Sequence, residues 1–227
     1  MKNVFYTLLT MIFLMLMQGL SAQKITYSDP WSNAGFTLQA STDKAASINF
    51  SIHDLNLEDI PVDGQVMKNI GMAESFLFND EGCPNLPGNG RYIAIPQGAT
   101  ATLHILSSRV ETMQGIDIVP APRIPKDDEA GELEYHKNLQ VYSNNAFYPA
   151  QPVTLSAPTQ IRGVDVVMLG ITPFQYNPVT KELKIYRDLK IEITFQGGNG
   201  HFGEDRLRSR FWDPILEDAL FNASVLP

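Results

Sequence analysis

Hydrophobic and polar residues alternate in several short stretches of the chain. Apolar residues occupy every second position in 36–40, 48–52, 101–105 and 189–195, and mostly polar residues lie between them. A period of two places successive side chains on opposite faces of a β-strand, so one face of each stretch is buried and the other contacts water. The pattern therefore predicts short strands that share an apolar core.

The clearest connection between strands is at Asn177-Pro178. Proline fixes φ at the second position of a type I turn, and the preceding Asn side chain can bond the backbone. Leu183 and Ile185 follow this turn at alternate positions. We therefore expect a β-hairpin here, followed by a separate amphipathic strand over 189–195.

Strand patterns with turn residues at short spacing, and few helical patterns, predict an all-β fold. The unbroken apolar run 164–169 is typical of a central strand. We expect an antiparallel β-sandwich over residues 23–197, which is an ordinary length for one such domain.

One helical pattern occurs near the end of the chain. Leu207, Phe211, Ile215 and Ala219 lie four residues apart, with polar residues on the other side. This spacing predicts a C-terminal amphipathic helix within a linker and connecting segment, residues 198–227. Its apolar face needs a partner, which is either this domain's own sandwich or a following domain.

The N-terminus has the layout of a secretory signal peptide. Lys2 precedes a run of apolar residues, and small residues end at Ala22. The apolar run is shorter than the roughly 20 residues of a membrane-spanning helix. We expect residues 1–22 to be removed after Ala22, which leaves a secreted or periplasmic protein with no stable membrane anchor.

The net charge and the cysteine content limit which partners and which chemistry this chain can have. The net charge is −8, and it becomes −9 when the signal peptide is removed with its single Lys and no acid. This argues against nucleic acid or an anionic membrane surface as a partner.

Cys83 is the sole cysteine, so an internal disulfide is impossible. A structural or surface role for Cys83 is favoured over a nucleophilic one.

The sequence contains no phosphate-binding Gly-rich loop, no HExxH and no Gly-x-Ser-x-Gly. The acidic cluster at 127–134 lacks the ligand spacing of a calcium loop, which favours a solvated charge run. We therefore predict no catalytic residue, no metal and no cofactor.

Residues 120–137 form a long segment without strand alternation. It contains three prolines, a group of acids, and the cations Arg123, Lys126 and Lys137. Structureless segments of this length inside compact domains are either functional loops or disordered. The segment alone leaves both alternatives open.

One stretch of the sequence carries a family resemblance, the run Gln175-Tyr176-Asn177-Pro178-Val179-Thr180-Lys181-Glu182-Leu183-Lys184-Ile185-Tyr186. This run resembles the propeptide family of gingipain-type (C25) cysteine peptidases. Weaker similarity extends to Phe147-Tyr148-Pro149 and to Gly82-Cys83-Pro84-Asn85-Leu86-Pro87. The resemblance covers most of the chain after the signal peptide and is loose before residue 80.

This resemblance implies a β-sandwich prodomain that covers the active-site cleft of a cysteine peptidase. The partner would be the catalytic domain, in cis or in trans. A protruding loop would present a basic residue to the specificity pocket, with Lys126 as first choice, Arg123 as second, and Lys137 in the same loop. The acids that follow Lys126 depart from the family pattern. Release would require proteolytic cleavage, and a peptidase domain is expected beyond residue 227.

Two other functions remain open from the residues themselves. A secreted adhesion or carbohydrate-binding sandwich would use exposed aromatic side chains, for which Trp31, Tyr148 and Trp212 are the candidates. A hydrolase that uses Cys83 as its nucleophile is the less favoured alternative.

Overall fold

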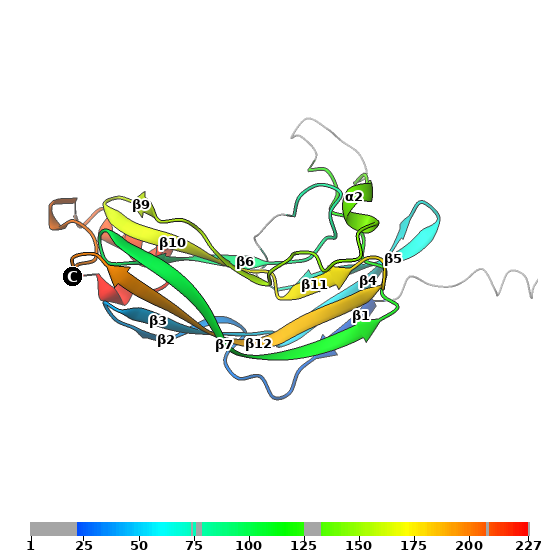
Figure 1. Cartoon of the computed structure of the whole chain (residues 1–227), viewed down its shortest axis with the longest axis horizontal. Helices are drawn as coiled ribbons and strands as arrows, with labels where there is room; N and C mark the ends of the chain where they lie inside the picture. Colours follow the sequence, from blue (N-terminus) through cyan, green and yellow to red (C-terminus); the bar gives the residue numbers. More distant parts are fainter. Residues whose placement is uncertain (1–21, 74, 76–78, 125–132, 208, 227) are drawn as a thin grey trace, which may run out of the picture.

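The computed structural model describes residues 22–73, 75, 79–124, 133–207 and 209–226 (Figure 1). In these residues twelve strands form three antiparallel sheets. The strands are β1 (Ala22–Thr26), β2 (Gly35–Ser41), β3 (Ala45–Ser51), β4 (Asp54–Val62), β5 (Gln65–Met72), β6 (Asn89–Ala94), β7 (Ala99–Gln114), β8 (Val153–Leu155), β9 (Thr159–Ile161), β10 (Val164–Ile171), β11 (Phe174–Asn177) and β12 (Glu182–Gly197). The helices are α2 (Leu139–Tyr142) and α3 (Asp213–Ala219), with 3-10 turns η1 (Asp205–Leu207) and η2 (Ala223–Val225).

Two of the sheets stack to form the sandwich (Figure 1). One has the order β11-β12-β3-β2 with β7 also paired to β12, and the other has the order β6-β10-β8 with β9 paired to β10. Ile48 and Ile191 from the first sheet and Ile93 and Leu169 from the second are fully buried in the same core. The predicted antiparallel β-sandwich is confirmed.

The predicted hairpin and the strand expected after it are one continuous strand, β12. Its first part pairs with β11, its later part pairs with β3, and β7 pairs with it along almost its whole length. An irregularity between Tyr186 and Asp188 places Arg187 as an extra residue on β12. The expected break between the two strands was wrong, because the polar pair Arg187-Asp188 forms a β-bulge and the strand continues through it.

The sheet β1-β4-β5 was not anticipated. Asp63 and Gly64 have φ values of 49° and 77° and connect β4 to β5. Positive φ at both positions is the requirement of a two-residue type I′ hairpin, and Asp-Gly is a preferred sequence for it. Leu55 and Leu57 of β4 are buried in the main core, so this sheet extends the same domain.

The C-terminal helix is shorter than predicted. Helix α3 begins at Asp213, and Pro214 lies in its first turn. Proline has no N–H to donate to the carbonyl four residues earlier, and in a helix its ring would clash with that carbonyl, so the helix does not extend back toward Leu207. Leu216 is buried against the sandwich, whereas Phe211 is 70% exposed. Among the described residues, no helix is long and apolar enough to span a membrane.

Candidate functional site: a loop fixed at both ends

The segment that leads into the proline-rich loop is hydrogen-bonded on both sides. The backbone N–H of Val119 donates to Lys68 O on β5 at 3.0 Å, and Asn85 N–H donates to Val119 O at 2.9 Å. Two residues later, Ala121 N–H donates to Cys83 O at 2.7 Å. The outgoing limb is therefore held by backbone hydrogen bonds to two different segments of the chain.

Both ends of the loop meet at Gly82. Gly82 N–H donates to Ala121 O at 2.9 Å, and Asn138 N–H donates to Gly82 O at 2.9 Å. Gly82 has φ of 78°, and a Cβ there would lie 2.8 Å from His136 O and 3.0 Å from Asn138 N. Only glycine fits this position without displacing the returning chain. We call residues 122–137 the anchored loop.

The returning limb is fixed by the short helix α2. Asn138 caps it, since its side chain accepts from Gln140 N–H at 3.0 Å. The Tyr142 hydroxyl donates to Ile118 O at 2.9 Å and so joins the returning limb to the outgoing one. Burial raises the pKa of Tyr142 well above its ordinary value, which keeps this hydroxyl protonated as a donor.

The three predicted site residues lie in or beside this loop in different ways. Arg123 is exposed on the outgoing limb. Lys137 is half-buried on the returning limb, with its Nζ 5.6 Å from the centre of the Tyr142 ring. Lys126 and the acids Asp127, Asp128, Glu129 and Glu132 lie outside the described residues. The structure thus places Arg123 and Lys137 at opposite ends of one anchored loop.

Cys83 is enclosed beneath the loop base and is 5% exposed. Burial, together with the neighbouring Cys83, raises the pKa of Tyr148 above its ordinary value. A nucleophilic thiol has to be partly accessible to a substrate, and this one is not. Among the described residues, no group of three or more His, Cys, Asp or Glu side chains is placed to hold a metal ion.

The tryptophans suggested for sugar binding have cations over their rings. Trp31 has the Arg109 guanidinium and the Lys190 ammonium each 5.0 Å from its ring centre. Trp212 has the Arg162 guanidinium 3.4 Å from its ring centre. Sugar binding by stacking needs an open ring face, so the two cations at Trp31 argue against a carbohydrate site there, while the single cation at Trp212 covers one face of that ring.

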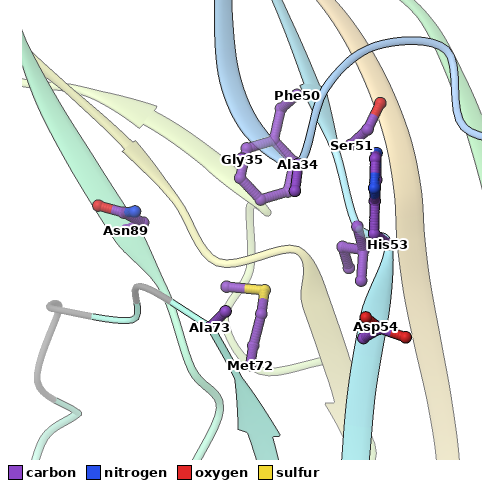
Figure 2. A pocket seen from close by; sticks show the side chains of 10 residues that line it. Ala34, Gly35, Phe50, Ser51, His53, Asp54, Met72, Ala73 and Asn89 are labelled. Atoms are coloured by element: carbon purple, nitrogen blue, oxygen red, sulfur yellow. The ribbon is translucent and has the colours of Figure 1, made fainter. Parts of the chain in front are cut away.

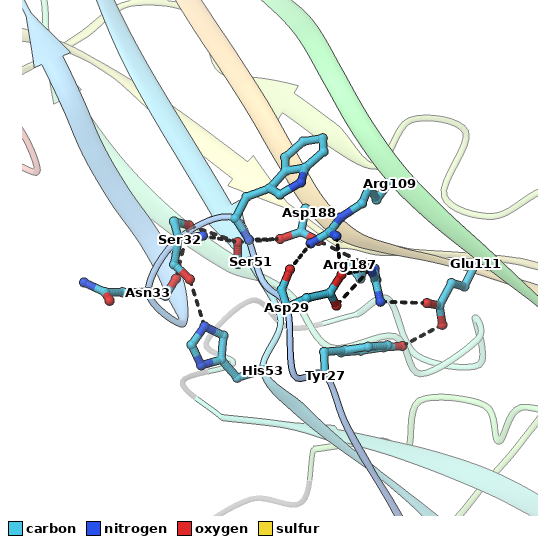
Figure 3. A network of polar contacts seen from close by, with 11 residues as sticks. Tyr27, Asp29, Ser32, Asn33, Ser51, His53, Arg109, Glu111, Arg187 and Asp188 are labelled. Atoms are coloured by element: carbon cyan, nitrogen blue, oxygen red, sulfur yellow. Dashed lines mark hydrogen bonds and ion pairs between the residues drawn. The ribbon is translucent and has the colours of Figure 1, made fainter.

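A polar network that was not predicted from the sequence holds the segment between β1 and β2 against the sheet (Figure 3). Its centre is Asp188, which is 1% exposed. Its carboxylate accepts from Trp31 N–H at 2.8 Å and from Ser51 Oγ at 2.7 Å, and Arg109 Nη2 lies 2.6 Å away. Arg109 also contacts Asp29 at 2.8 Å. The buried charge is thus paired and hydrogen-bonded, as burial requires.

A small pocket opens beside this network (Figure 2). It has a volume of about 80 Å³ and is lined by residues that include Phe50, His53, Met72 and Asn89. Small-molecule sites usually measure about 300–1,000 Å³. His53 is already hydrogen-bonded, with its Nε2 2.8 Å from Ser32 O. The pocket is therefore too small to serve as a substrate site.

The described residues form a β-sandwich in which the two limbs of the anchored loop are both hydrogen-bonded to Gly82. Residues 28–205 match the Propeptide_C25 family. The chain belongs to this family, the propeptides of C25 cysteine peptidases, and is a non-catalytic prodomain.

Relatives of known sequence agree with this assignment. The chain is 26% identical to Lys-gingipain HG66 of Porphyromonas gingivalis over 212 residues, which cover 85% of this chain and 12% of that protein. It is 24% identical to gingipain R2 of the same species, over 71% of this chain and 22% of that protein. The chain therefore corresponds to a small part of the length of these relatives.

Two solved structures share the fold. A chain from the complex of P. gingivalis RgpB pro- and mature domains matches with a TM-score of 0.74 and 22% identity, over 85% of this chain and all of that one. A chain from a structure on the zymogenic latency of P. gingivalis gingipain K matches with a TM-score of 0.64 and 23% identity, over 78% of this chain and all of that one.

Proposed function

We propose that this domain is the secreted N-terminal prodomain of a gingipain-like cysteine peptidase. It acts as an intramolecular inhibitor by placing the anchored loop in the active-site cleft. The observation that carries the proposal is the attachment of both loop ends to Gly82. A loop whose ends are fixed loses less conformational entropy on binding, and it leaves the cleft less readily than a free peptide would.

Lys126 is the residue we propose for the specificity pocket, with Arg123 as the second choice. A cation that enters an acidic pocket forms charge-assisted hydrogen bonds, about twice as strong as neutral ones. Asp127 and Asp128 follow Lys126 directly. The side of the cleft that receives them must therefore carry little negative charge.

The proposal also includes export of the precursor and assistance in folding the peptidase. The signal peptide over residues 1–22 would direct the precursor out of the cytoplasm, and the sandwich would support folding of the attached catalytic domain. The similarity to the gingipain K structure, which concerns zymogenic latency, supports an inhibitory role for this chain. Release would follow cleavage in the anchored loop or after the sandwich.

The test is inhibition of the mature C25 peptidase from the organism that makes this chain, by purified residues 23–227. We expect tight inhibition, and Lys126→Ala should weaken it by roughly 10- to 100-fold. Lys44→Ala, an exposed lysine in the turn between β2 and β3, is the matched control and should have no effect. Absence of inhibition at micromolar concentration would contradict the proposal.

A further inference from the structure

The anchored loop divides the strands into two groups that are interleaved in the sandwich. Strands β1 to β7 precede the loop, and β8 to β12 follow it. One of the stacked sheets combines β2, β3 and β7 with β11 and β12, and the other combines β6 with β8, β9 and β10. Among the described residues, therefore, neither half of the chain contains a complete sheet of the sandwich.

The pairing between the two halves is extensive. β7 from the first half lies along almost the whole length of β12 from the second (Figure 1). β3 also pairs with β12, and β6 pairs with β10. Four fully buried side chains share one core, two from before the loop and two from after it: Ile48, Ile93, Leu169 and Ile191. A cut in the anchored loop breaks none of these contacts.

The end of the chain adds further bonds between the halves. Asn222 is fully buried, accepts from Ala94 N–H at 2.7 Å, and donates through Nδ2 to Ala94 O at 2.9 Å. Phe221 N–H donates to Tyr92 O at 2.8 Å. The first half, through β6, thus also holds the last segment of the second half.

Both limbs of the anchored loop keep their attachments when the loop is cut. Ala121 on the outgoing limb accepts from Gly82 N–H, which lies in the same half. On the returning limb, Asn138 N–H donates to Gly82 O at 2.9 Å, and the Tyr142 hydroxyl donates to Ile118 O at 2.9 Å. These last two bonds join the halves directly, so they hold the returning limb against the first half after a cut.

Hydrolysis of one peptide bond in the loop consumes one water and leaves a carboxylate and an amine, so the two halves become separate chains. An intact short connection acts as an effective concentration on the order of millimolar. A stable domain is unfolded in roughly one molecule in a thousand to one in a million. The product of these two values is a dissociation constant of about 1 nM to 1 µM for the halves.

We propose that one cut in the anchored loop leaves a two-chain prodomain that keeps its fold and still blocks the peptidase, so this cut alone does not release the enzyme. The inference rests on the proposed function and selects, between its two routes to release, the cut after the sandwich. That cut ends the covalent connection to the catalytic domain and removes the effective concentration that keeps the loop in the cleft. A cut in the loop leaves this connection intact.

The test uses residues 23–227 with a TEV protease site inserted between Leu133 and Glu134, so that Lys126 stays joined to the outgoing limb after the cut. At roughly 10 µM, above the dissociation constant of the halves, the cut domain should elute as one particle in gel filtration and give two chains on a denaturing gel. The mature C25 peptidase of the same organism should keep the same residual activity with cut and uncut domain, within about threefold. The same insertion with an uncleavable site is the control.

Two results would overturn the inference: the halves separate in gel filtration, or they stay together and the peptidase regains its activity. If residues 23–227 without the insertion do not inhibit, the proposed function fails, and gel filtration still decides whether the cut domain holds together. An insertion between Arg123 and Ile124 repeats the test with the cut at the other end of the loop.

Gly82→Ala in the same insertion background tests whether Gly82 holds the cut ends. A Cβ on Gly82 would lie 3.0 Å from Asn138 N and displace the returning limb. Cutting should therefore raise the residual peptidase activity about tenfold more in this variant than in its parent. An equal effect of cutting in both would show that the bonds at Gly82 do not keep the cut loop in place.

Discussion

Asn138 donates its backbone N–H to the carbonyl oxygen of Gly82 at 2.9 Å, and the position of a Cβ on Gly82 would lie only 3.0 Å from that same nitrogen. The two residues are far apart in the sequence, yet the contact closes the anchored loop. Because Gly82 N–H also holds Ala121, one glycine determines where the loop leaves the sandwich and where it returns.

Gly82→Ala should disrupt the loop base. The added Cβ meets backbone atoms on the returning limb, and the residue must also keep φ near 78°. We expect a loss of roughly 1–3 kcal/mol in the free energy of unfolding from backbone strain, and a clear loss of inhibition. Urea unfolding and the inhibition constant measure the two effects.

Gly115→Ala is the control for this prediction. Gly115 has φ of 70°, but nothing lies within 4 Å of the position of its Cβ. It should therefore show the backbone strain without displacing the loop. Equal inhibition by wild type and Gly82→Ala would show that the loop base has no role in blocking the peptidase.

Tyr142→Phe should loosen the returning limb. The variant removes the hydrogen bond from the Tyr142 hydroxyl to Ile118 O, which is worth about 1 kcal/mol. Hydrogen exchange at the amides of 133–138 should become faster, while exchange in β10 should not change. Unchanged exchange in both regions would show that this contact does not hold the limb.

Asp188→Ala should be strongly destabilising. It removes the acceptor of Trp31 N–H and Ser51 Oγ, while Arg109 keeps its contact with Asp29. A buried donor left without its acceptor costs roughly 1–3 kcal/mol. Chemical unfolding measures this, with Asp43→Ala in the exposed turn before β3 as the control. A loss below about 1 kcal/mol would contradict a central role for Asp188.

High pH should unfold the domain through its tyrosines. Burial, followed by Glu111, raises the pKa of Tyr27 to about 12, and burial also raises the pKa of Tyr176 to about 12. An unfolded tyrosine ionises near 10. The folded state therefore retains protons that the unfolded state loses, and stability falls as the pH rises from about 10 to 12. Urea unfolding between pH 8 and 11 tests this, and Tyr27→Phe should reduce the slope.

The N-terminus provides a separate prediction. Cleavage after Ala22 gives an exported chain that begins with Gln23, and Ala22→Arg should leave the uncleaved precursor because signal peptidase needs a small residue there. N-terminal sequencing of the exported protein distinguishes the two. A mature protein that begins well before or after Gln23 would show that the cleavage site was wrongly placed.

The sequence predicted strands best where buried and exposed residues alternate with a period of two. Ile191 and Ile193 alternate with polar residues, and both are fully buried in β12. Asp63-Gly64, a preferred type I′ sequence, is an equally direct hairpin signal. The bulge at Arg187 was not foreseeable from periodicity, because Asp188 is buried by partners from three distant segments.

The site was less predictable than the fold, for a physical reason. The proline-rich composition marked the segment as unusual, but its anchoring depends on hydrogen bonds between Gly82, Ala121 and Asn138, which are distant in sequence. At the C-terminus, the spacing of Phe211 and Ile215 correctly marked an apolar face. Periodicity could not tell which apolar face packs on the sandwich, since Leu216 and Leu220 have the same spacing.

The most direct test is the alkylation rate of the peptidase's catalytic cysteine by a peptidyl chloromethyl ketone, in the presence of saturating prodomain. Cys83 is buried and should not compete for the reagent. If the anchored loop occupies the cleft, the wild-type domain should slow alkylation by at least about 100-fold, and a variant with residues 123–137 replaced by a short Gly-Ser linker should not. Alkylation at the full rate in the saturated wild-type complex would contradict the account.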